Sequence, residues 1–186
     1  MATFREKLKS KLPSRQEALP VFSTIVFFVF TWALYLMFNQ VPAWLFFMNV
    51  WNVLVLTAYV LAFALFESGV MLAFMVLLSL VFPARLFKQK FVAQSVTLIV
   101  LMSIGAVWVQ RHVSSIYSLV LWELITYPIF FLIAIVLLTL GFSFLYDRFK
   151  RLPRFIMSIA DRMMIFFYVY VPLSLISIVV IIVRNV

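Results

Sequence analysis

The longest apolar run in the chain extends from Ala43 to Ala84 and contains a single charged residue, Glu67. As one α-helix it would measure about 63 Å, because each residue adds about 1.5 Å. The hydrocarbon core of a bilayer is only about 30 Å thick. The run is therefore too long for one membrane crossing, and we expect it to be broken or to lie partly along the membrane surface.

Four further apolar segments indicate a polytopic membrane protein built from helices. They cover residues 20–39, 91–110, 115–146 and 163–183. Of all residues, 67% are hydrophobic and 11% are charged, whereas soluble domains have about 25% charged residues. The short loops leave no room for a soluble catalytic domain. We predict an all-α bundle in one transmembrane domain over residues 20–186, preceded by a basic, amphipathic cytoplasmic segment over residues 1–19.

The distribution of lysine and arginine favours five membrane crossings over six. Five crossings place 13 of the 15 basic residues in the cytoplasm and only Arg111 and Arg184 outside, whereas six crossings divide them seven to eight. Cytoplasmic loops normally carry the excess of basic residues. We therefore predict a multi-pass plasma-membrane protein with its N-terminus in the cytoplasm and its C-terminus outside.

Five crossings leave one apolar segment that does not cross the membrane. We favour residues 43–57 as an interfacial helix, because Trp44, Asn49, Trp51 and Asn52 combine the aromatic and amide groups typical of a membrane surface. The alternative is a re-entrant hairpin over residues 69–84, after a turn at Glu67–Gly69. The first arrangement places Glu67 inside the hydrocarbon, and the second places it at the inner surface.

The net charge of +9 predicts contact with anionic phospholipids. In a soluble protein this charge would indicate nucleic acid, but here the basic residues flank apolar segments, as in proteins that bind acidic headgroups. We therefore expect no nucleic-acid partner. The candidate headgroup contacts on the cytoplasmic side are Arg85, Lys88, Lys90, Arg148, Lys150, Arg151, Arg154 and Arg162.

Glu67 is the first candidate for a functional polar residue. A carboxylate in the bilayer costs about 2.5–3.5 kcal/mol on insertion scales, so it normally faces a partner or water. It would hold a partner subunit or relay an ion, or else be hydrated at an interfacial turn. At the outer interface the candidate polar residues are Arg111 and His112, which close the segment over 91–110, and Glu123.

The sequence lacks the residues that enzymes and metal sites need. It contains no Cys and one His, which excludes thiolate and multi-histidine metal sites formed by this chain alone. No phosphate-binding loop or nucleophile motif is present. We therefore expect no catalytic residue, metal or cofactor.

These observations favour a non-catalytic membrane subunit or scaffold that contacts partner helices and anionic lipids. A small transporter or ion-coupled carrier that uses Glu67 is the alternative. The five crossings with an extra apolar stretch after the first also resemble, in architecture alone, the membrane domain of lipoteichoic-acid-synthase-like phosphotransferases. This resemblance implies a third function, an accessory membrane domain for lipid-linked phosphotransfer.

Overall fold

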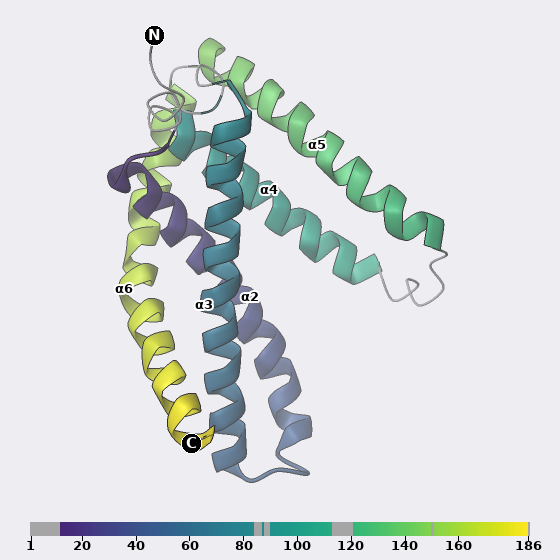
Figure 1. The fold of residues 1–186 in the computed structure, drawn as a ribbon, viewed down its shortest axis with the longest axis vertical. Helices are drawn as coiled ribbons and strands as arrows, with labels where there is room; N and C mark the ends of the chain where they lie inside the picture. Colours follow the sequence, from purple (N-terminus) through teal and green to yellow (C-terminus); the bar gives the residue numbers. More distant parts are fainter. Residues whose placement is uncertain (1–11, 84–86, 88–89, 113–120, 150, 186) are drawn as a thin grey trace. The chain divides into compact units, whose positions relative to one another are not determined.

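The computed structural model describes residues 12–83, 87, 90–112, 121–149 and 151–185, and no strand occurs among them. Four helices are long and apolar enough to cross a membrane, and α4 adds a shorter apolar stretch over Phe91–Val107. The predicted all-α membrane bundle is confirmed. In order along the chain (Figure 1), the helices are α2 (Arg15–Trp44), α3 (Val50–Val81), α4 (Phe91–His112), α5 (Leu121–Arg148) and α6 (Arg151–Asn185).

The chain divides into two compact units. The first, which we call the three-helix unit, contains residues Arg15–Met75 and Ile159–Val186, and so α2, most of α3 and most of α6. The second, which we call the hairpin unit, is built on Val76–Ser158 and contains α4 and α5.

Large side chains from all three helices form the core of the three-helix unit. Val26 and Phe30 of α2 are fully buried and pack with Leu61 and Ala64 of α3, which are 5% and 2% exposed. Tyr170 of α6 stacks on Phe30 with ring centroids 4.9 Å apart. Two more ring pairs join α2 to α6, Phe22–Phe167 at 5.8 Å and Phe27–Phe166 at 4.6 Å.

The core of the hairpin unit lies along α4. Phe87 contacts Phe82 and Phe91 through their rings, with centroids 6.0 and 5.9 Å apart. Phe87 and Phe91 are almost completely buried. Residues of the same α4 stretch, Ala93, Val96, Leu98 and Ile99, are also at most 3% exposed.

Helix α2 begins at Arg15, and the predicted start near residue 20 is wrong. Ser14 precedes the helix and Glu17 lies in its first turn, which is the Ser-x-x-Glu pattern of a capping box. Pro20 therefore lies inside the helix, where it lacks the N–H that would bond one turn back. The start of the helix therefore coincides with the capping-box pattern and not with the proline.

Helix α3 is continuous through Glu67, Ser68 and Gly69, so the predicted turn there and the re-entrant hairpin over 69–84 are wrong. Ser68 is compatible with the helix because its hydroxyl donates to the carbonyl oxygen of Ala64 at 2.7 Å. A continuous α3 of 32 residues measures about 48 Å. The extra apolar length is thus taken up within long helices.

Residues 43–57 form the end of α2, a short connection and the start of α3. Trp44 ends α2 and Val50 begins α3. Asn49 caps α3, since its Oδ1 accepts a hydrogen bond from the backbone N–H of Asn52 at 2.9 Å. The predicted interfacial helix over residues 43–57 is therefore wrong, because these residues belong to two long helices and the connection between them. Phe46 and Phe47 in the connection are 85% and 89% exposed, and their contact with a membrane interface stays a prediction.

We expect Gly69→Ala to leave the fold intact and to stabilise it by about 0.5–1 kcal/mol, because glycine is unfavourable inside a helix. A Cβ atom built on Gly69 meets no atom within 4 Å. Reversible unfolding in mixed detergent micelles measures the change. A marked loss of stability would contradict a helical backbone at this position.

Candidate functional site

Glu67 lies far from both ends of α3. It is 17 residues after Val50 and 14 before Val81, or about 26 and 21 Å along the helix axis. Its side chain is exposed. The structure therefore presents this carboxylate on the surface of a long apolar helix.

The residues around Glu67 form a broad exposed surface, which we call the outward face of α3. Phe63 and Phe66 are each 67% exposed, and Val70 is 52% exposed. Gly69 and Ala73 are also exposed and lie at the edge of this surface, beyond Phe66, since residues two apart do not share a face. The outward face of α3 consists of Phe63, Phe66, Glu67, Gly69, Val70 and Ala73.

The opposite side of α3 faces the core of the three-helix unit. Leu61 and Ala64 pack there against α2, and Ser68 is completely buried. Glu67 lies three residues after Ala64 and so near the edge of this packed side, but its own side chain is exposed. The carboxylate therefore does not point into the interior of the unit.

A second polar cluster, the α4–α5 seam, joins the two helices of the hairpin unit. The Nζ of Lys90 lies 2.5 Å from Oδ1 of Asp147 and donates to the carbonyl oxygen of Ser143 at 3.3 Å. The hydroxyl groups of Thr97 and Tyr146 are hydrogen-bonded to each other, and Tyr146 also donates to the carbonyl oxygen of Ala93 at 3.1 Å. The seam consists of Lys90, Ala93, Thr97, Ser143, Tyr146 and Asp147.

The α4–α5 seam acts as a structural contact between two apolar helices. Interhelical hydrogen bonds of this kind contribute about 0.6 kcal/mol on average in membrane proteins. The ion pair is partly open to solvent, because 73% of the Asp147 side chain is exposed, and such pairs add little stability. The seam therefore positions α4 and α5, and its groups already bind one another.

The α4–α5 seam was not predicted, although the sequence contains a signal for it. Lys90, Thr97 and Tyr146 are polar residues at the edges of apolar segments, and Lys90 and Thr97 are seven residues apart, on one side of a helix. Ser143 and Asp147 have the same relation at a spacing of four. These spacings indicate polar helix faces but do not identify which faces meet.

Most other hydroxyl groups in the helices bond within their own helix. Each donates to the carbonyl oxygen four residues earlier, a common arrangement for Ser and Thr in apolar helices. They therefore do not mark a polar path through the protein. This group comprises Ser23, Thr24, Thr57, Ser103, Thr139, Ser174 and Ser177.

The predicted headgroup contacts are only partly visible. Arg148, Arg151, Arg154 and Arg162 are exposed, as lipid contact requires. Lys90 binds Asp147 within the hairpin unit, and its contact with lipid stays a prediction. Arg85, Lys88 and Lys150 lie outside the described residues.

For the candidate residues at the predicted outer interface, the structure describes the backbone only. Arg111 and His112 form the end of α4, as predicted, and Glu123 lies in the first turn of α5. Their side chains lie outside the described part of the structure. Within the described part, no group of three or more His, Cys, Asp or Glu residues could hold a metal ion.

No protein-family model, curated protein or solved structure matches this chain.

Proposed function

We propose that the protein is a non-catalytic integral membrane subunit or scaffold of a larger complex. The outward face of α3 packs against a transmembrane helix of another subunit, and basic residues on the cytoplasmic side bind anionic lipid headgroups. The protein lies in the plasma membrane with its N-terminus in the cytoplasm and its C-terminus outside.

The exposed carboxylate of Glu67 on α3 carries this proposal. In a bilayer a carboxylate at this position faces lipid, water or a protein surface outside the three-helix unit. Exposure of a carboxylate to lipid costs about 2.5–3.5 kcal/mol on insertion scales, whereas a partner helix with a donor or a cation removes this cost. A subunit contact therefore explains the outward direction of Glu67 better than a pathway through the interior of the three-helix unit.

Gly69 and Ala73 support close packing of a second helix. They are four residues apart and both exposed, and a Cβ on Gly69 would meet no atom of this chain within 4 Å. Small residues at this spacing allow two transmembrane helices to approach closely. The outward face of α3 thus combines a polar contact with room for a partner backbone.

The charges of α6 support the proposed orientation. Arg162 and Arg184 enclose 21 uncharged residues and are about 33 Å apart along the helix, close to the thickness of the hydrocarbon core. Arg151 and Arg154 lie beyond Arg162, so most basic residues of α6 lie at its N-terminal end. Under the positive-inside rule this end is cytoplasmic.

We expect Glu67→Gln to weaken association with the partner subunit roughly tenfold, since it removes the charge that the partner binds. The protein is extracted from its native membranes in mild detergent, and co-purifying subunits are measured by native mass spectrometry. Asp161→Asn is the matched control, because Asp161 is an exposed carboxylate at the end of the α6 apolar segment. An unchanged complex in Glu67→Gln, or a wild-type protein that is always a monomer, contradicts the proposal.

A steric variant tests the same contact without changing the charge. Gly69→Leu places a bulky side chain on the outward face of α3. It should also reduce the amount of partner subunit that co-purifies with the protein. Gly141→Leu is its control, because Gly141 is an exposed helical glycine in α5 with the same open surroundings. Equal loss in both glycine variants would point to a general defect and contradict a contact at Gly69.

The carrier alternative predicts a different response to the same substitution. If Glu67 relays an ion, Glu67→Gln abolishes proton or cation flux in vesicles that contain the purified protein alone. We expect that neither the wild-type protein nor Glu67→Gln produces more flux than empty vesicles do. Flux that depends on Glu67 would contradict the subunit function and support the ion-coupled carrier.

A further inference from the structure

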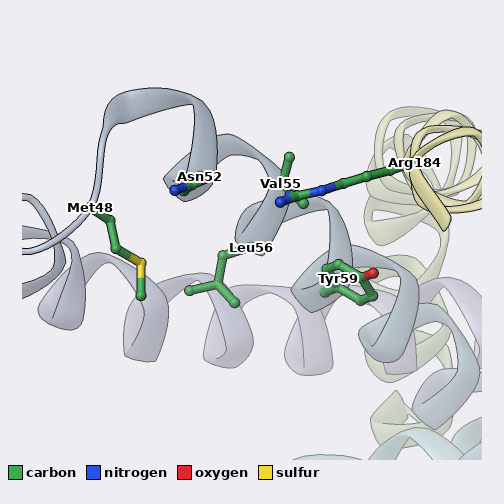
Figure 2. Close-up of a pocket in the computed structure, with 6 residues that line it drawn as sticks. All are labelled: Met48, Asn52, Val55, Leu56, Tyr59 and Arg184. Carbon is green, nitrogen blue, oxygen red and sulfur yellow. The ribbon is translucent and has the colours of Figure 1, made fainter.

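A shallow cavity of about 400 Å³ lies at one end of the three-helix unit. Five of its lining residues come from the connection before α3 and from the first turns of α3, and the sixth, Arg184, comes from the end of α6 (Figure 2). These segments are more than 120 residues apart in the sequence. The lining residues are Met48, Asn52, Val55, Leu56, Tyr59 and Arg184.

The cavity combines an apolar wall with a basic residue. In Figure 2 the Arg184 side chain extends from α6 toward α3 and ends beside Val55. Met48, Val55 and Leu56 provide apolar surface, while Asn52 and Tyr59 carry polar groups. None of the six lining residues is acidic, so the lining has a net positive charge.

The position of Arg184 places the cavity at the level of lipid headgroups. Arg184 is about 33 Å from Arg162 along α6, and no charged residue lies between them. With Arg162 at one boundary of a hydrocarbon core about 30 Å thick, Arg184 reaches the other boundary. The exposed aromatic residues Phe46, Phe47 and Trp51 lie in the same segment, as expected for an interface.

We propose that this cavity binds an anionic phospholipid of the outer leaflet. The Arg184 guanidinium donates to the phosphate, since its fork of N–H groups matches phosphate oxygens. The side-chain amide of Asn52 supplies a further donor, and an acyl chain lies against Met48 and Leu56. This site differs from the cytoplasmic basic residues and from the outward face of α3, so it goes beyond the subunit function.

Lipid titration of the purified, delipidated protein, followed by native mass spectrometry, tests the site. We expect Arg184→Gln to reduce the affinity for the most tightly bound phosphatidylglycerol molecule about tenfold, because a hydrogen bond to a charged group is removed. Gln40→Ala is the control, since Gln40 is an exposed polar residue of the same unit that neither lines the cavity nor belongs to the proposed headgroup contacts. Phosphatidylcholine should bind more weakly than phosphatidylglycerol and respond less to Arg184→Gln.

A second variant keeps the charge and fills the cavity. Leu56→Trp should lower the affinity for both lipids while Arg184 remains. Inorganic phosphate at millimolar concentration should not displace the bound lipid, because it lacks an acyl chain. The proposal is overturned if Arg184→Gln binds phosphatidylglycerol like wild type, if Gln40→Ala loses it equally, if Leu56→Trp has no effect, or if phosphate alone displaces it.

Discussion

Replacing Phe30 with Ala is expected to lower the free energy of unfolding by about 2–3 kcal/mol. Phe30 is fully buried, packs with Val26, Leu61 and Ala64, and stacks on Tyr170. In soluble proteins a buried Phe→Ala change costs about 3–5 kcal/mol, which includes transfer from water. Lipid tails are as apolar as the core, so here only lost packing and stacking contribute.

Reversible unfolding in mixed detergent micelles, followed by helical circular dichroism, measures this loss. Phe38→Ala is the matched control, because Phe38 lies on the same helix and is 63% exposed. It should change stability by less than about 0.5 kcal/mol, as exposed positions usually do. Equal destabilisation by both substitutions would show that Phe30 does not join the three helices of this unit.

Replacing Ala93 with Leu is expected to destabilise the hairpin unit by about 1–3 kcal/mol through overpacking. Ala93 is 3% exposed, and its carbonyl oxygen accepts the hydrogen bond from Tyr146. A larger side chain would force α5 away from α4. The contacts of Tyr146 with Ala93 and Thr97 would then lengthen or break.

Hydrogen exchange resolves this effect along the chain, because it reports opening of local segments. Exchange in Ala93→Leu should accelerate in α4 and α5. Ala106→Leu is the control, since Ala106 is an exposed residue of the same helix and should leave exchange unchanged. Protection of α4 and α5 equal to that of wild type in Ala93→Leu would contradict the packing of this seam.

The helical membrane fold follows from the sequence because apolar length and basic flanks are local properties. A run of about 20 apolar residues must satisfy its backbone hydrogen bonds internally, and a helix does this without tertiary contacts. Two prolines also lie at helix boundaries, where this residue is tolerated: Pro83 follows α3 and Pro153 lies in the first turn of α6. Glu67 was also identified at this level, because it is the only charge in its run.

The errors arose where two local signals compete. Ser68 and Gly69 beside Glu67 are typical of a turn, yet in apolar surroundings a helical backbone keeps its hydrogen bonds, and Ser68 bonds to Ala64. The start of α2 was also wrong, because the apolar segment begins at residue 20, whereas the helix begins at Arg15, directly after Ser14 and with Glu17 in its first turn. For Ser68 and Gly69, local propensity is a weak guide because hydrogen-bond satisfaction dominates within a membrane.

The apolar helices, and the position of Glu67 within one of them, could be predicted from the sequence because helix length and hydropathy do not depend on tertiary contacts. The outward direction of Glu67, the contact of Lys90 with Asp147 and the place of Arg184 beside the start of α3 could be read only from the folded chain. The physical reason is that these helices are apolar on nearly every side. Their composition therefore gives no preferred inner face, and shape complementarity between distant segments selects the faces that meet.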